Sequence, residues 1–136
     1  MLAELTAVAC ALVGGVFFAF SGFVMAALNR LPDDAGAAAM RAVNVTAVRP
    51  PLMLALFGTA AACVAVLVTG PSALQVAGAV VYLVGTVGVT VAANVPLNDA
   101  LEREAATWPR YRRTWTRWNH LRTAAALAAA VLLVVD

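Results

Sequence analysis

The sequence predicts an all-α integral membrane protein, a four-helix transmembrane bundle with a short amphipathic cytoplasmic helix between spans one and two. Hydrophobic residues make up 63% of the 136 residues and charged residues only 12%, about half the charged share of a soluble domain. Four apolar stretches approach the roughly 20 residues that cross a bilayer. The chain therefore has room for a single transmembrane domain, residues 1–136.

The first predicted span covers about residues 5–29, "LTAVACALVGGVFFAFSGFVMAALN". At about 1.5 Å per residue this stretch is long enough to cross a hydrocarbon core of about 30 Å. Glu4 precedes it where a signal peptide carries Lys or Arg, and the run is too long for the apolar region of a signal peptide. We therefore expect a retained helix.

The segment after this span predicts a short amphipathic helix. Pro32, Asp33 and Asp34 form a helix-start signal. Residues at helical spacing then recur on one side: Ala37, Met40, Val43 or Asn44, and Ala47. We expect this helix to continue or kink into the second span, about residues 51–70, at Pro50 and Pro51. A tight turn, "GPS" at 70–72, closes that span.

The third predicted span covers about residues 73–95 and the fourth about residues 119–135. Gly78, Gly85 and Gly88 are predicted to thin one side of the third span for close helix packing. The fourth span is near the short limit. Its first turn carries Arg122, which we expect to reach the interface by snorkelling.

The arginines predict the topology and exclude one class of function. All nine basic residues are arginines, and they fall within 30–49 or 103–122. With four spans, the positive-inside rule places loops one and three in the cytoplasm and both termini outside the inner (plasma) membrane. A net charge of only +2, with arginines flanking spans, argues against a nucleic-acid partner. The sequence leaves open whether the chain forms a homo-oligomer.

Polar residues gather at the cytoplasmic ends of the predicted spans, where burial is costly unless the group is paired or functional. Asn94 and Asn98 share one helical face, and Trp115, Asn119 and Arg122 share another, so two polar stripes are predicted to face each other. The asparagines have helix packing or capping as an alternative role, and the tryptophans an interfacial aromatic belt. A solvated face near anionic headgroups is predicted for Arg110, Arg112, Arg113 and Arg117.

His120 is the only histidine, and three roles stay open for it: general base, axial heme ligand or interfacial residue. By helical period it points about 100° away from Asn119, so both cannot face one pocket centrally. A zinc or non-heme iron site would require three protein ligands and is disfavoured. Cys10 and Cys63 lack CxxC spacing and are interpreted as packing residues.

Two blocks, "NVPLNDAL" and "WPRYRRTWTRWNHLRT", together with "FSGFVMAALNRLP" and "AMRAVN", resemble the anthrone oxygenase family of small four-helix membrane proteins. The resemblance covers essentially the whole chain, and its main features are N-x-P-x-N and W-x-x-W-N-x-x-R. It implies an oxygenase that acts on polycyclic phenols of the aromatic polyketide class and converts an anthrone to an anthraquinone. The resemblance implies that this reaction uses O2 and needs no bound flavin or metal. The chain also has no glycine-rich dinucleotide fingerprint.

This chemistry requires a base, donors for a developing oxyanion and flat apolar walls. We expect His120 as the base, with Tyr111 a weaker candidate. The phenolate and peroxide oxygens of the substrate are expected to bind to Arg122, Asn94, Asn98 and Asn119. Its aromatic rings are expected to stack on Trp115 and Trp118, with Phe17 or Phe20 below. Asn44 and Arg41 complete the predicted substrate-binding residues. The alternatives are a heme-dependent membrane oxidase with His120 as axial ligand, and a non-enzymatic scaffold or transporter.

Overall fold

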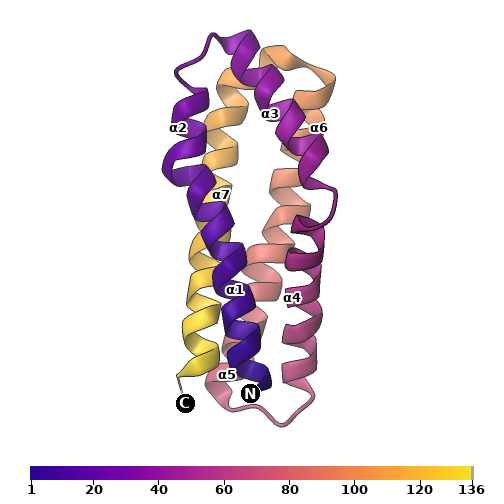
Figure 1. The fold of residues 1–136 in the computed structure, drawn as a ribbon, viewed down its shortest axis with the longest axis vertical. Coiled ribbons are helices and arrows are strands. Elements are labelled where there is room, and N and C mark those ends of the chain that lie inside the picture. Colours follow the sequence, from indigo (N-terminus) through magenta and orange to yellow (C-terminus); the bar gives the residue numbers. More distant parts are fainter. Residues whose placement is uncertain (136) are drawn as a thin grey trace.

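The protein is all-α in the computed structural model, which describes residues 1–135. The α-helices are α1 (Leu2–Ala19), α2 (Met25–Leu28), α3 (Asp33–Ala47), α4 (Leu52–Leu67), α5 (Ala73–Val81), α6 (Val95–Arg103) and α7 (Trp108–Val134). The long helices run side by side (Figure 1). The start of α1, the turn between α4 and α5 and the end of α7 lie at one end, and α2, α3 and α6 lie at the other.

Within residues 1–135, two continuous helices are long and apolar enough to cross a membrane. The first, Leu2–Leu28, joins α1 to α2 through a π-helical segment, Phe20–Val24. The second, Ala73–Arg103, joins α5 to α6 through π-helical segments Tyr82–Gly88 and Thr90–Asn94. This helix continues well past the predicted end of the third span, with Pro96 directly after a π-helical turn, where the hydrogen-bond ladder already changes register.

The predicted kink before α4 is confirmed. α3 begins at Asp33, as the helix-start signal indicates. The negative charges of Asp33 and Asp34 in its first turn interact favourably with the helix dipole. α3 and α4 are bent by 52° at the break that contains Pro50 and Pro51, and taken as one bent segment they are long and apolar enough to form a third span. At its other end α4 leads to Gly70, whose φ of +73° suits glycine. Ser72 then begins α5 with a capping box to Gln75.

The last helix differs from its prediction. α7 begins at Trp108, well before Asn119, and Pro109 occupies the first turn, where a missing N–H costs nothing. The arginine-rich block is therefore helical and continuous with the apolar segment behind it. Because of that polar first part, α7 as a whole is less apolar than the helices that could cross a membrane, and the fourth span stays a prediction.

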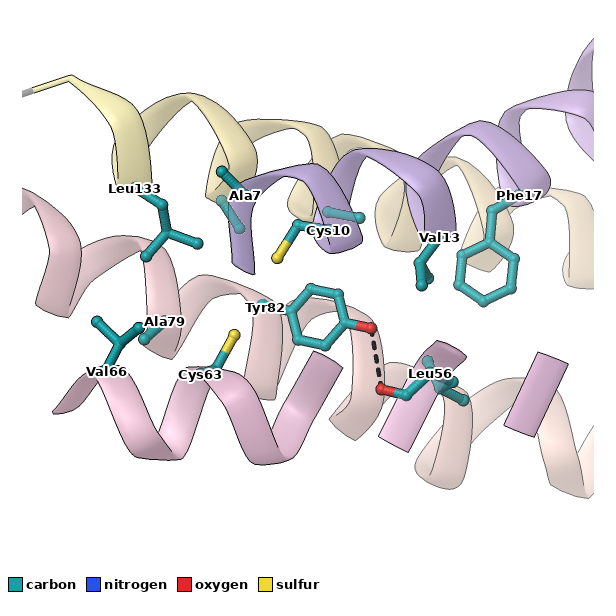
Figure 2. Packing of buried hydrophobic residues seen from close by; sticks show 12 residues of the cluster. Ala7, Cys10, Val13, Phe17, Leu56, Cys63, Val66, Ala79, Tyr82 and Leu133 are labelled. Carbon is teal, nitrogen blue, oxygen red and sulfur yellow. Dashed lines mark hydrogen bonds between the residues drawn. The ribbon is translucent and has the colours of Figure 1, made fainter. Parts of the chain in front are cut away.

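The half of the bundle near the N-terminus is tightly packed (Figure 2). Cys10 and Cys63 are fully buried there and turn their sulfurs toward each other from α1 and α4. The Tyr82 hydroxyl donates to the Leu56 carbonyl at 3.1 Å. We call this cluster the packed half; its buried members are Ala7, Cys10, Val13, Phe17, Leu56, Cys63, Val66, Ala79, Tyr82, Ala126, Ala129 and Leu133.

Two of the three predicted packing glycines contact α7 closely. A Cβ added at Gly85 would lie 2.5 Å from Ala125 Cβ, and one at Gly78 would lie 3.1 Å from the Ala129 carbonyl oxygen. A Cβ at Gly88 would meet only the carbonyl of Leu83 in its own helix, at 3.5 Å. The prediction for Gly88 is therefore wrong, because the π-helical segment turns this residue away from the neighbouring helices.

Candidate functional site

A cavity lies under α3, between α1, α4, α7 and the helix Ala73–Arg103. Its volume is about 140 Å³. Most of the wall is apolar, and Phe17, Phe20 and Trp115 supply its aromatic rings. Its hydrogen-bonding and charged side chains, apart from the indole of Trp115, are those of Asn44, Thr90, Asn98 and Arg122.

Arg122 is the one charged side chain that is buried within residues 1–135, with 5% of its surface exposed. Its Nη2 donates to Asn119 Oδ1 at 2.6 Å and its Nη1 donates to Thr90 Oγ1 at 3.2 Å. Its Cζ lies 3.9 Å from the ring centroid of Phe17 and 5.2 Å from that of Trp115. The expectation that Arg122 snorkels is wrong, because these neighbours hold it inside the bundle.

No carboxylate neutralises this guanidinium in the part of the chain that the structure describes. Every acidic residue there is exposed, and the three ion pairs formed join Met1 to Glu4, Arg41 to Glu102 and Arg112 to Asp33. Arg122 has only neutral hydrogen-bond partners. An unpaired charge in a low-dielectric cavity is costly by itself, and its interaction with an anion there is strong.

Asn119 fixes the position of Arg122 by joining α7 to α1. Its Nδ2 donates to the carbonyl of Phe17 at 2.7 Å and also to Ser21 Oγ. Both partners lie where α1 gives way to the π-helical segment Phe20–Val24. The side chain of Asn119 is fully buried, so its amide orients the arginine with one end and anchors the neighbouring helix with the other.

The helix Ala73–Arg103 faces α7 with a polar stripe of Thr86, Thr90, Asn94 and Asn98. Residues four apart drift around an α-helix, but π-helical turns hold more residues per turn and offset this drift. Thr86 donates to the Arg122 carbonyl at 3.2 Å, and Asn94 Nδ2 donates to the Trp115 carbonyl at 3.4 Å. The two predicted stripes thus lie against each other. Thr86 and Thr90 were missed, although their four-residue spacing from Asn94 was the available signal.

A second polar cluster lies nearer α3. Tyr111 Oη donates to Asn98 Oδ1 at 2.8 Å, and Asn44 Nδ2 donates to Tyr111 Oη at 3.5 Å. The ring of Tyr111 is stacked between Trp108 and Trp115, at centroid distances of 5.8 and 6.2 Å. Burial raises the pKa of Tyr111, which lies ahead of the predicted fourth span. A phenol that keeps its proton and donates it to Asn98 acts as a donor, not as a base.

Six predicted site residues do not line the cavity: Asn94, Tyr111 and Asn119 are buried beside it, and the other three lie on the outer surface. His120 is exposed on the outer face of α7 while Asn119 is fully buried, so the angular separation inferred from the helical period is confirmed. Trp118 is 41% exposed, and Arg41 pairs with Glu102 at 3.3 Å on the surface. The cavity lining contains no histidine and no carboxylate. A heme held by His120 would lie outside this cavity.

The described residues 1–135 bring together no group of three His, Cys, Asp or Glu side chains that could hold a metal ion. The chemistry that this cavity offers comes instead from one cation, several amide and hydroxyl donors, and aromatic walls. Such a set suits a flat apolar molecule that carries or develops negative charge on oxygen.

The helices and the cavity define a class, a small helical membrane protein with a buried arginine inside an aromatic cavity. Within that class the chain belongs to the anthrone oxygenase family, whose sequence model matches residues 40–132. The match includes Asn44, Asn98, Tyr111 and Arg122. Comparisons with curated proteins and with solved structures found no match.

Proposed function

We propose that this protein is a four-span membrane oxygenase that oxidises an anthrone-type polycyclic phenol to the corresponding quinone with O2, inside the cavity under α3. Family membership supports the general reaction class. The charge of Arg122, the one buried charge among the described residues 1–135, is the observation that carries the proposal for the site. α7 runs along α1 in the bundle, which supports its crossing the bilayer as the fourth span. The arginine-rich segments 30–49 and 103–122 then lie on the cytoplasmic side of the inner (plasma) membrane.

The reaction balances with O2 as the only oxidant. The substrate loses a proton from the CH2 carbon opposite its carbonyl and becomes an enolate. That carbon then transfers electrons to O2 and forms a C–O bond, giving a peroxide that takes up a proton. Loss of water from the hydroperoxide breaks the O–O bond and the remaining C–H bond and leaves the second carbonyl. One oxygen atom enters the product and the other leaves as water.

Arg122 stabilises the enolate in this proposal. No side chain that lines the cavity suits the role of base, so the protein acts on the ionisation equilibrium: the proton goes to water and the anion binds beside the guanidinium. Each tenfold preference for the anion lowers the pKa of the bound substrate by one unit. His120, which lies on the outer face, takes no part in this scheme.

The two polar clusters match the two oxygen-bearing edges of the product. In an anthrone the carbonyl and the reacting CH2 carbon lie on opposite edges of the central ring. We place the carbonyl edge toward Arg122 and the reacting carbon toward Asn44 and Asn98, whose amide groups donate to the peroxide. Tyr111 holds Asn98 in position through its bond to Asn98 Oδ1. Trp115 lies between the clusters, with its ring 5.2 Å from Arg122 Cζ and 6.2 Å from the Tyr111 ring, and supplies a stacking surface.

The substrate reaches the cavity from the bilayer. The lining includes exposed apolar side chains on the outer surface of the helices: Val48, Phe57, Val91 and Val95. The cavity volume of about 140 Å³ is close to that of a cavity that holds benzene, roughly 150 Å³. A tricyclic substrate therefore places part of its ring system in the opening, against these side chains.

The test combines a spectrum with isotope incorporation. Detergent-purified protein is scanned for heme absorption and analysed for metals, then supplied with a hydroxylated anthrone under ¹⁸O2. We expect O2 uptake, a quinone carrying one ¹⁸O atom, and a loss of about 100- to 1000-fold in kcat/KM for Arg122→Gln. His120→Ala is the matched control and retains activity.

Three outcomes would contradict the proposal. A heme absorption band that His120→Ala abolishes, together with its activity, would indicate a heme-dependent oxidase. A folded protein without O2 uptake would favour a scaffold or transporter. Full activity in Arg122→Gln would remove the buried cation from the mechanism.

A further inference from the structure

The outer face of α7 changes its chemistry abruptly along its length. Arg113, Arg117 and His120 follow one another at helical spacing and are all exposed. The same face then continues with exposed apolar residues, of which the large ones are Leu121, Leu127, Val131 and Val134. A helix face that is cationic and then apolar matches the order of a phospholipid, headgroup first and acyl chain second.

The cationic part of this face lines an open hollow. Asn29, at the end of α2, and Arg112, Arg113, Thr116 and Arg117 of α7 surround a space of about 460 Å³. α2 lies beside this part of α7 in Figure 1. The hollow is distinct from the cavity under α3, since the two share no lining residue. Trp118 follows Arg117 directly and is 41% exposed, and tryptophan is a residue type enriched at membrane interfaces.

The charges in the hollow are only partly balanced by the protein. Arg112 has a carboxylate partner, with Nη1 3.7 Å from Asp33 Oδ1. Arg113 and Arg117 form no ion pair among residues 1–135. These two arginines are four residues apart on one helix, a spacing at which like charges repel and destabilise the helix. An anion bound between them removes this repulsion, and two guanidinium groups offer the planar forks that suit a phosphate.

The geometry points to a binding site for one anionic phospholipid, with its phosphate between Arg113, Arg117 and Asn29 and its acyl chains along the apolar part of the same face of α7. This site goes beyond the oxygenase reaction and does not depend on it. It also gives His120 a location at the edge of the headgroup, apart from the cavity. The favoured lipids carry net negative charge, as phosphatidylglycerol does, because a zwitterionic headgroup brings its own cation to the arginines.

Native mass spectrometry of the detergent-solubilised protein tests this site. The protein is given an equal mixture of phosphatidylglycerol and phosphatidylcholine with identical acyl chains, and the ratio of bound lipids is measured. We expect a preference for phosphatidylglycerol that falls about 25-fold in the double variant Arg113→Gln/Arg117→Gln, roughly fivefold per arginine. Arg113→Lys/Arg117→Lys keeps the charge and retains part of the preference.

The matched control is Arg49→Gln/Arg103→Gln, which removes the same charge from two exposed arginines outside the hollow. It leaves the lipid ratio unchanged if the site is local. An equal fall in this control, or equal binding of both lipids by the wild type, would overturn the proposal. Inorganic phosphate is the remaining arm, and phosphate that displaces the lipid at equal concentration would indicate a free-anion site instead.

Discussion

The two ends of the bundle treat their buried polar atoms differently. In the packed half, Tyr82 donates to a backbone carbonyl of α4 and Thr59 donates to that of Ala55, so each buried donor is satisfied. Near the cavity, four buried side-chain atoms of the described residues have no hydrogen-bond partner: Asn94 Oδ1, Trp108 Nε1, Trp115 Nε1 and Arg122 Nε. Unpaired buried polar groups cost stability and are uncommon in native proteins.

This difference indicates how the chain divides its tasks. The packed half supplies close apolar contacts and fully paired polar groups, which stabilise the fold. The half around the cavity keeps an unneutralised cation and unpaired polar atoms. Two of these atoms, Trp115 Nε1 and Arg122 Nε, belong to side chains that line the cavity, where a ligand with oxygen atoms can pair with them. The π-helical segment Thr90–Asn94 lies in this second half and carries Thr90, which lines the cavity, whereas Tyr82–Gly88 begins in the packed half at Tyr82. π-Helical turns occur frequently at functional sites.

The largest expected effect on activity comes from neutralising the charge of Arg122 in the cavity, because the packed half contains no such charge. Thr90→Asp places a carboxylate where a hydroxyl now accepts from Arg122 at 3.2 Å, so the guanidinium is paired internally. We expect kcat/KM for the anthrone to fall about 100-fold, because the enolate loses its counter-charge. Steady-state O2 uptake measures this.

Thr90→Asn is the isosteric neutral partner of that variant. It keeps an acceptor beside Arg122 and adds no charge, so we expect activity within about threefold of the wild type and an unchanged Tm. Equal losses in the two variants would show that shape at this position matters and that charge does not.

Much of this architecture is predictable from the sequence, and the exceptions are informative. Apolar stretches and the proline pair predict the spans and the bend before α4, because both act locally. The predicted start of the last helix lies too late in the chain, because the first turns of α7 are polar and carry no apolar stripe. Pro109, in the first turn of the helix, is a local start signal there. Hydropathy identifies apolar helices and misses polar ones.

The site was harder to predict than the fold. Periodicity separates Asn119 from His120, because two successive residues of a helix cannot share a direction. It does not predict where Arg122 points, since that depends on Thr90 and Asn119 and on π-helical turns that change the register of the opposite helix. A long side chain takes its direction from partners distant in the sequence, which one periodic pattern does not identify.

The next prediction concerns the packed half. Gly85→Ala puts a methyl group 2.5 Å from Ala125 Cβ, so the helices must separate. We expect the free energy of unfolding to fall by about 1–3 kcal/mol, measured by thermal or denaturant unfolding in detergent. Gly88→Ala, on the same helix but without a neighbouring helix to meet, is expected to be neutral or slightly stabilising. Equal Tm values for the two variants would contradict the close contact.

A smaller effect is expected at the opening of the cavity. Val91 is 57% exposed and lines the cavity. Val84 is 65% exposed, lies in the preceding π-helical segment of the same helix and does not line the cavity. Val91→Trp fills the opening and raises KM for a tricyclic substrate about tenfold, with kcat nearly unchanged. Val84→Trp leaves KM unaltered if the substrate enters at this opening, and a rise in both variants would indicate a general effect of surface bulk.

The smallest expected effect lies outside both halves, on the pair that ties α3 to α6. Arg41 Nε lies 3.3 Å from Glu102 Oε2, and both side chains are partly exposed. Glu102→Gln removes the ion pair but keeps the bond from Arg41 Nη2 to the Glu102 carbonyl, 3.0 Å long. We expect a stability loss below about 1 kcal/mol that disappears in high salt. If apolar packing alone holds α3 over the cavity, KM stays unchanged. A large rise in KM would show instead that the Arg41–Glu102 pair holds α3 in place.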